Sequence, residues 1–210
     1  LSKGLLDTLY MTVLSTTAAY VIGLPVGVIL VVTEKGGLLA CAPVNKILGF
    51  IVNILRSVPF LILLIAVIPF TRFVVGTSIG ASATVVPLVI AAAPFIARMV
   101  ESSLKEVDKG SVDAAIAMGA SPFQIIVKVL LPEARPSLLL GAAISATTIL
   151  SYSAMAGIVG GGGLGDIAIR YGYYRYRTNI MLITVAVLVV LVQIIQEFGT
   201  KLSKWSDKRN

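Results

Sequence analysis

Half of the ten acidic side chains of this 210-residue chain lie in one stretch, residues 101–135. They are Glu101, Glu106, Asp108, Asp113 and Glu133. The chemistry open to them is limited, because the chain has no histidine and only one cysteine, Cys41. This composition excludes histidine-based triads, imidazole metal sites, histidine proton relays, internal disulfides and cysteine-cluster metal sites. We therefore predict no catalytic residue and no metal site.

The stretch 101–135 predicts two short helices. In the first, we expect Ser111 to be the N-cap and Asp113 to lie in the first turn, where a carboxylate favours the helix dipole. Gly119 is expected to end this helix. Its small, apolar face consists of Ala114, Ala115 and Met118.

A second short helix is predicted to begin after Ser121. Ser121 is expected as its N-cap, Pro122 as its first residue, and Gln124 as the partner that completes a capping box. We expect Pro132 to end this helix and Pro136 to begin the next long one. A helix of small residues between two strong breaks is suited to docking in a groove of another protein. An amphipathic helix lying on the membrane surface explains the same pattern equally well.

The composition outside this loop is that of a membrane protein. Residues are 57% hydrophobic and 13% charged, and the mean hydropathy is +0.97, whereas soluble domains have about 25% charged residues. Long intervals without charge separate Asp7 from Glu34, Arg72 from Arg98, Arg135 from Asp166, and Arg177 from Glu197. A fifth apolar segment, before Arg72, is interrupted by Arg56, which can snorkel to the interface. Trimmed at the glycine-rich turns 76–80 and 160–163, these intervals predict an all-α integral membrane protein. Its five transmembrane helices lie at about 8–33, 46–71, 83–100, 136–158 and 178–199, in a single domain over 1–210.

The basic residues predict the orientation. With the N-terminus outside, the outer segments hold five basic residues and the inner segments hold twelve. The outer ones are Lys3, Arg72, Arg170, Arg175 and Arg177; the inner ones are Lys35, Lys46, Arg56, Arg98, Lys105, Lys109, Lys128, Arg135, Lys201, Lys204, Lys208 and Arg209. The positive-inside rule then places the loop 101–135 and the C-terminus in the cytoplasm, with Arg98 as an anchor. The net charge of +7 reflects loops that face anionic headgroups, and we expect no nucleic-acid partner.

The loop resembles a known signature. Asp113-Ala114-Ala115, three residues, Gly119, nine residues, Val129, one residue and Leu131-Pro132 is similar to the "EAA" signature of ABC-importer permease subunits. Asp113 and Val129 stand where glutamate and isoleucine are usual. The resemblance implies a coupling helix that inserts into a cleft of the ATPase subunit, with Asp113 as its helix-start carboxylate and Gly119 as a sharp turn that allows close approach. The implied coupling residues are Asp113, Ala114, Ala115, Met118, Gly119 and Pro132.

Residues 51–80, 93–100 and 151–165 also resemble the methionine-uptake permeases of this superfamily. The resemblance implies a homodimer in a bacterial cytoplasmic membrane that imports methionine by alternating access. Its partners would be two copies of an ABC ATPase subunit and an extracytoplasmic solute-binding protein. The chain has no glycine-rich phosphate loop ending in GK[ST]. We therefore expect ATP and Mg²⁺ to bind the partner ATPase, and no cofactor or enzymatic activity in this chain.

The fourth predicted span contains the candidates for the substrate pathway or gate. These are Ser151, Tyr152, Ser153 and Met155. Hydroxyl groups in a bilayer need partners, so these side chains are expected to face protein or a cavity. Close helix packing is the simpler explanation of the serines. The thioether of Met155 is suited to closing a pore around a thioether solute, and the resemblance favours a gate at the two-fold axis over the filling of a gap.

Other functions account for the pattern less well. A permease for another amino acid or small organic solute is the nearest alternative. A secondary transporter would need intramembrane carboxylates, yet all acidic residues lie at or outside the ends of the predicted spans. An intramembrane Ser–Lys enzyme would need a lysine in mid-span, and none lies there. The tyrosines and arginines of 166–177 are expected to form an interfacial aromatic belt or a landing surface for a binding protein. Because the chain opens on leucine, we expect a short N-terminal piece to precede it.

Overall fold

The computed structural model describes residues 1–207, and every regular element within them is helical. Four helices are long and apolar enough to cross a membrane. They are α1 (Ser2–Val32), α5 (Ala81–Lys105), α9 (Arg135–Ala156) and α11 (Thr178–Ser206). The predicted all-α membrane fold is confirmed. Lys208 and Arg209, which entered the count of basic residues, lie outside the described residues.

The predicted second span is wrong as a single helix. Three helices occupy its place: α2 (Ala42–Ser57), α3 (Phe60–Ala66) and α4 (Ile68–Val75). The axes of α2 and α3 differ by 101°. The break falls at Val58, which is extended (ψ 123°), because the ring of the following Pro59 disfavours helical backbone before it. An apolar run therefore predicts a segment suited to the membrane, but it does not by itself predict a continuous helix.

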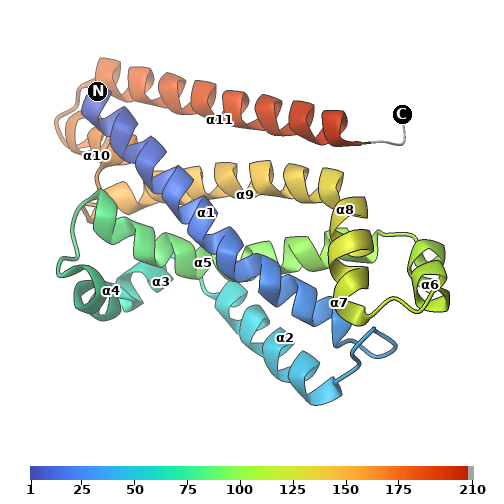
Figure 1. The fold of residues 1–210 in the computed structure, drawn as a ribbon. Coiled ribbons are helices and arrows are strands. Elements are labelled where there is room, and N and C mark those ends of the chain that lie inside the picture. Colours follow the sequence, from blue (N-terminus) through green and yellow to red (C-terminus); the bar gives the residue numbers. More distant parts are fainter. Residues whose placement is uncertain (208–210) are drawn as a thin grey trace.

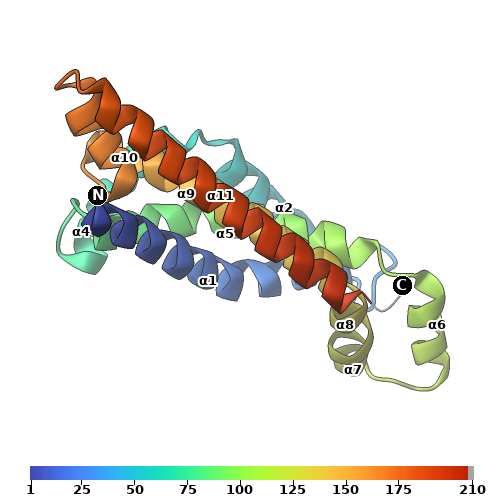
Figure 2. The same ribbon diagram turned by 90° about the horizontal axis from the view of Figure 1, so that it is seen from above.

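The shorter elements gather at the two ends of the bundle. At one end, α6 (Lys109–Ala117), α7 (Pro122–Ile125), the π-helical turn η1 (Ile126–Leu130) and α8 (Leu131–Glu133) connect α5 to α9. At the other end, the 3-10 turn η2 (Gly157–Val159), α10 (Gly163–Ile167) and the π-helical turn η3 (Ala168–Tyr173) connect α9 to α11. Figures 1 and 2 show the N-terminus beside α10 and the end of α11 near the α6–α8 end.

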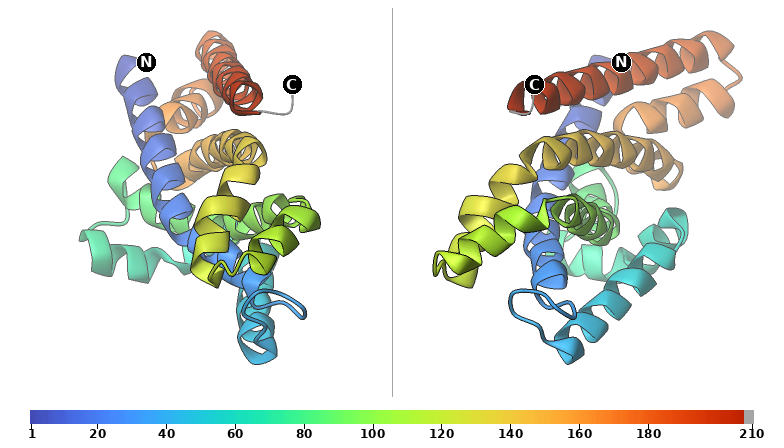
Figure 3. Two further views of the ribbon diagram at one scale, coloured as in Figure 1. Left: turned by 45° about the vertical axis from the view of Figure 1, so that its right-hand side comes forward. Right: turned by 90° about the vertical axis from the view of Figure 1, so that its right-hand side faces the viewer.

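The long helices form layers in the order α11, α9, α5 and α2, and α1 crosses them (Figures 1 and 3). The most extensive packing between two helices joins α1 to α5. A Cβ atom on Gly23 would lie 2.8 Å from the carbonyl oxygen of Ala93, and one on Gly27 would lie 2.6 Å from that of Ala97. Glycine at these positions therefore allows the two backbones to touch, as in helix pairs packed through small residues in membranes.

A glycine turn, residues 160–163, joins three long helices at the α10 end. The Gly80 N–H donates to the Gly160 carbonyl (3.0 Å), which fixes the start of α5. Thr84 of α5 donates to the Gly161 carbonyl (3.2 Å), and the Leu164 N–H donates to the hydroxyl of Thr8 in α1 (2.8 Å). The turn thereby satisfies backbone groups that a bilayer or a tight interior would leave without water.

The glycine after this turn generates a prediction. In Gly165→Ala, the new Cβ would lie 2.2 Å from the Ala154 carbonyl oxygen, so α10 has to move away from α9. We expect a loss of about 1–3 kcal/mol in the free energy of unfolding, as for overpacked interiors. Thermal unfolding of the detergent-solubilised protein measures it.

The matched control is Gly49→Ala in α2, where the nearest atom to a new Cβ lies at 3.5 Å. This variant should unfold at the temperature of the unsubstituted protein or slightly above it, because alanine favours a helix more than glycine does. Equal unfolding temperatures for Gly165→Ala and Gly49→Ala would show that the α9–α10 contact is not tight.

Candidate functional site

The helix α6 begins earlier than its sequence predicts. Its N-cap is Asp108, whose Oδ2 accepts from the Ser111 N–H at 3.1 Å, so the prediction that Ser111 is the cap is wrong. Ser111 supplies the backbone donor and Asp108 the side-chain acceptor, because the helix starts at Lys109. Asp113 consequently lies in the second turn and not in the first, and no acidic residue lies in the first turn. Its carboxylate therefore gains little from the helix dipole, which acts within the first turn.

Most of the predicted coupling residues are exposed on α6 and the turn after it. Asp113, Ala114, Met118 and Gly119 face solvent, and Met118 is 81% exposed. Ala115 is the exception, since it is buried against the rest of the protein. Gly119 has φ +79°, a left-handed conformation that favours glycine, and a Cβ there would meet no atom within 4 Å. The predicted small-residue face is thus a protruding surface attached through Ala115.

Two exposed apolar side chains of this surface were not among the predicted residues. Ile116 is 50% exposed, and Phe123 of α7 is 74% exposed. Large apolar residues held out in solvent beside Met118 mark an interaction surface. A signal was present in the sequence, because Phe123 follows a predicted N-cap and Pro122, which places it in the exposed first turn of a helix.

The start of α7 agrees with its prediction. The Ser121 hydroxyl accepts from the Gln124 N–H (3.4 Å), and the Gln124 side chain accepts from the Ser121 N–H (2.9 Å). This is the predicted capping box, with Pro122 in the first turn. The sharp turn at Gly119 therefore lies between two helices whose ends are both fixed.

The prediction that Pro132 ends the second helix is wrong. α7, η1 and α8 continue through it to Glu133. The turn before Pro132 is π-helical, with the Leu131 N–H donating to the Ile126 carbonyl, and this wider turn accommodates the proline. Pro136 does lie at the start of α9, as expected.

A cavity of about 590 Å³ lies between α6 and the loop that joins α1 to α2. Its charged lining comes from Glu34 and Lys35 of the loop, Lys105 of α5, and Lys109 and Asp113 of α6. Lys105 donates to Glu34 at 2.8 Å and to Glu101 at 3.0 Å, which ties the loop to the end of α5. The carboxylate of Asp113 is thus exposed at the edge of a hollow with mixed charge.

The predicted pathway residues of α9 divide between two faces. Ser153 is buried, and its hydroxyl donates to the Leu150 carbonyl within the same helix (2.7 Å). Tyr152 is partly buried and stacks on Phe60 of α3, with ring centroids 4.5 Å apart. Ser151 and Met155 are exposed. Of the four, only Ser151 and Met155 share a face that no other part of residues 1–207 covers.

That face continues along α9. Leu140 and Ile144 are exposed as well, and Thr148 is partly exposed; with Ser151 and Met155 these residues follow steps of four, four, three and four residues. Such spacing places side chains on one face of a helix. The other faces of α9 pack against α1, α5 and α11. We name these five residues the α9 stripe; the three additional members were missed, although their spacing is visible in the sequence.

Residues 19–201 match the family described as binding-protein-dependent transport system inner membrane component. The chain belongs to this family. Its members are components of the inner membrane, and the chain is accordingly a multi-pass subunit of a transport system.

Individual relatives of this permease are close. It is 56% identical over 97% of its length to the probable D-methionine transport system permease protein MetI of Vibrio cholerae, of which it covers 90%. It is 54% identical over 75% of its length to the D-methionine transport system permease protein MetI of Escherichia coli K12, of which it covers 72%.

Solved structures show the same fold. A structure of the MetNI methionine ABC transporter in an inward-facing conformation contains a chain that is 50% identical. The TM-score is 0.98, with 99% of this permease and 96% of that chain covered. An amino acid ABC transporter crystallised with histidines, 22% identical, has a TM-score of 0.78 over 96% of this permease and 91% of that chain, which shows a shared fold alone.

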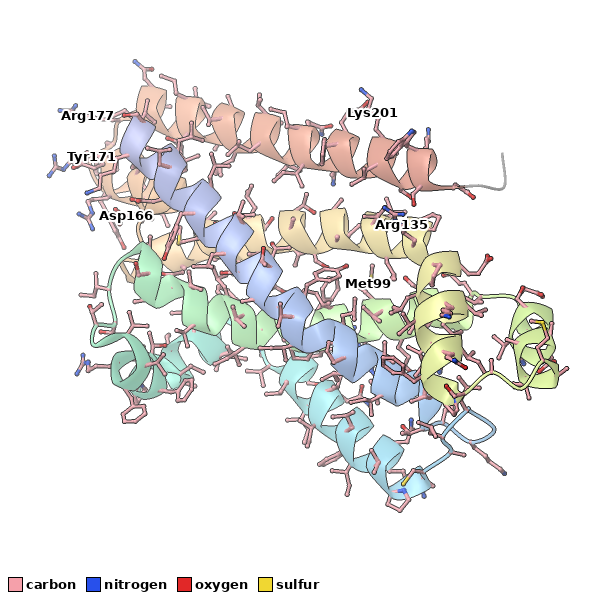
Figure 4. All side chains as sticks on the ribbon, in the orientation of Figure 1. Met99, Arg135, Asp166, Tyr171, Arg177 and Lys201 are labelled. Carbon is pink, nitrogen blue, oxygen red and sulfur yellow. The ribbon has the colours of Figure 1, made fainter. Side chains whose placement is uncertain are left out.

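The segment 166–177 lies at the end of the permease opposite α6. Figure 4 shows Asp166, Tyr171 and Arg177 at that end, and Arg135 and Lys201 toward the other. Arg170 pairs with Asp166 at 3.1 Å, and the guanidinium of Arg175 lies 4.8 Å from the ring centroid of Tyr171. Two of the three arginines of this segment, which the predicted orientation places outside, are therefore engaged by neighbours in the same segment.

The corrected N-cap of α6 gives a testable result. Asp108→Ala removes the acceptor of the Ser111 N–H, and we expect α6 to lose about 1 kcal/mol of stability, as for other N-caps. Amide hydrogen exchange of residues 109–117 in the permease should become about fivefold faster. Ser111→Ala is the matched control, because only the backbone of Ser111 takes part. Faster exchange in Ser111→Ala than in Asp108→Ala would restore Ser111 as the cap.

Proposed function

We propose that this chain is the membrane-spanning permease subunit of an ATP-driven importer that carries methionine into the cytoplasm. One observation carries the proposal: the chain is 56% identical over 97% of its length to a permease named for D-methionine transport. The match in fold to a chain of an inward-facing methionine ABC transporter supports it.

The working unit is proposed to contain two copies of this chain, two ABC ATPase subunits and an extracytoplasmic solute-binding protein. The α9 stripe supports pairing with a second copy, because it is an uncovered face on a helix that is packed on its other sides. The protruding Ile116, Met118 and Phe123 support docking of the ATPase. ATP and Mg²⁺ bind that partner in this proposal, and the permease itself catalyses no reaction.

The orientation proposed for the permease places α6 in the cytoplasm and the N-terminus outside. The excess of basic residues in the inner segments supports it. Closure of the ATPase pair on ATP moves the two α6 helices toward each other, and the attached long helices rock from the inward-facing to the outward-facing arrangement. Return to the inward-facing arrangement releases methionine inside. Because α6 joins α5 through only three residues, 106–108, motion of α6 reaches the bundle directly.

Met155 is proposed as a gate residue of this pathway. Its exposed thioether lies on the α9 stripe near the end of the helix, so a second copy would bring two such side chains together. Ser151 belongs to the same face. Ser153 is proposed to act in helix packing only, since its hydroxyl is buried and already bonded, while Tyr152 would hold α3 against α9 beside the pathway.

Uptake by the reconstituted importer tests the function. We expect vesicles that hold this permease with its ATPase and binding protein to accumulate labelled methionine when ATP is present on the ATPase side. Excess unlabelled L- or D-methionine should compete, and excess leucine or glutamine should not. Hydrolysis of ATP without accumulation of labelled methionine would refute the substrate and leave an importer of another solute.

Gly119 tests the coupling surface. In Gly119→Val, a β-branched residue has to adopt φ near +79°, which costs about 1–2 kcal/mol, and its side chain adds bulk where the ATPase approaches. We expect methionine-stimulated ATP hydrolysis to fall by about tenfold or more while membrane insertion is unchanged. Gly119→Asn is the control, because asparagine tolerates this conformation, and it should retain more of the stimulation. Full stimulation in Gly119→Val would contradict the assignment.

A further inference from the structure

The helix α2 is weakly embedded in the bundle. Of its 16 residues only Val52 is buried, and Ile47, Phe50, Ile51 and Ile54 are exposed. Val52 packs in a small cluster with Leu30 of α1 and Ala97 of α5. Both ends of α2 lead into bends: a loop containing Gly36 and Gly37 precedes it, and the 101° bend to α3 follows it. Apolar burial alone therefore fixes the position of α2 loosely.

Hydrogen bonds from Arg98 supply the main polar attachment of α2 to α5. Nη2 of Arg98 donates to the Gly49 carbonyl (3.2 Å) and to Oδ1 of Asn53 (2.8 Å), both in α2. Nη1 donates to Glu101 at 2.6 Å, one turn further along α5. The expectation that Arg98 is an anchor at a membrane face is therefore incomplete, because its guanidinium is directed toward α2 and α5 continues to Lys105. Hydrogen bonds from a charged donor are stronger than neutral ones.

Glu101 is held from both sides. Its Oε2 accepts from Arg98 and its Oε1 from Lys105, which also pairs with Glu34 at the start of the loop before α2. The carboxylate thereby orients the guanidinium that reaches α2. We call Arg98, Glu101, Gly49 and Asn53 the α2 clamp.

One donor of the clamp is left over. Nε of Arg98 is buried and meets no acceptor within residues 1–207. A buried donor without a partner is costly, so this arrangement does not satisfy Arg98 fully. The fold of the chain as a whole matches that of a chain in an inward-facing transporter. An arginine whose Nε lacks a partner in one arrangement can gain a hydrogen bond in the other arrangement.

We propose that Arg98 is a positioning residue which holds α2 against α5 in the inward-facing arrangement and releases it in the outward-facing one. Its two bonds to α2 then set the balance between the two arrangements, since a contact made in only one state shifts the population toward that state. This inference rests on the proposed importer function. Because α5 leads through three residues into α6, the clamp connects the coupling surface with the helix that precedes the bend.

The test measures the distance between α2 and α5 in the complete importer. Spin labels are placed at Phe50→Cys and Ser102→Cys, both exposed and outside the clamp, in a Cys41→Ser background. Importers that carry only one of the two labels on each copy identify the distances between copies. Among the remaining distances, we expect one main α2–α5 distance without nucleotide and a second after trapping with ATP and vanadate. The same distance in both conditions would overturn the proposal.

Two substitutions of Asn53 should act in opposite directions. Asn53→Ala removes an acceptor of Arg98. Without nucleotide, the ratio of the population at the second distance to that at the first should therefore rise about tenfold. Asn53→Asp adds a negative charge opposite Arg98. In the trapped state, the population at the second distance should therefore be smaller than in the unsubstituted importer. A shift in the same direction in both variants, or no shift in either, would refute the clamp.

Lys46→Met is the matched control. It removes an exposed charge of α2 that takes no part in the clamp and leaves the bonds of Arg98 to α2, so the distances should stay as they are. Methionine uptake by the unsubstituted complex separates the two hypotheses. If that complex imports methionine while both Asn53 variants keep the unsubstituted distances, the clamp alone fails. If it imports no methionine, the proposed substrate fails, and the distances still report on the clamp.

Discussion

The contact between α1 and α5 is the constraint on which the rest of the bundle depends. Gly23 and Gly27 lie against the carbonyls of Ala93 and Ala97 so closely that no Cβ atom fits between the helices. In a bilayer the lipid tails are as apolar as the side chains, and helices associate through close packing and hydrogen bonds. The two backbones therefore approach where side chains are smallest. With α1 and α5 fixed in this way, α9 and α2 lie on opposite sides of α5.

Backbone N–H and carbonyl groups obtain their hydrogen-bond partners in different ways at the two ends of the bundle. At the α10 end, carbonyls of the glycine turn 160–163 accept from Gly80 and Thr84, and the N–H of the following Leu164 donates to Thr8, so three helices are joined at one place. At the α6 end, polar side chains cap each helix, with Asp108 for α6 and the Ser121–Gln124 box for α7. The first end is held by long-range contacts. The second is assembled from helices that are capped locally, and it carries the exposed side chains of Ile116, Met118 and Phe123.

The helix α2 is attached to its neighbours mainly by a few side-chain hydrogen bonds. Asn45 donates to the Leu30 carbonyl at one end of α2, and Arg98 donates to Gly49 and Asn53 further along. Each is a bond between a side chain and a neighbouring helix, and such bonds are few compared with the continuous packing of α1 on α5. A helix held by a few directional bonds changes position at lower cost than one held by a buried face.

The sequence alone was enough to predict the long spanning helices and several features of the loop 101–135. Long uncharged intervals require spanning helices, because a bilayer offers no water to unpaired peptide groups. The spacing of Asp113, Gly119 and Pro132 carries the resemblance on which the proposed coupling loop rests. Ser121, Pro122 and Gln124 correctly predicted the start of α7, since capping depends on residues three positions apart. Tertiary structure alone decided the rest. Ser153 and Met155 are neighbours in one helix, yet packing against α1, α5 and α11 buries the first and leaves the second exposed. The break at Val58 interrupts an apolar run that composition reads as continuous. The direction of the Arg98 guanidinium depended on where α2 lies, and no pattern within α5 contains that information.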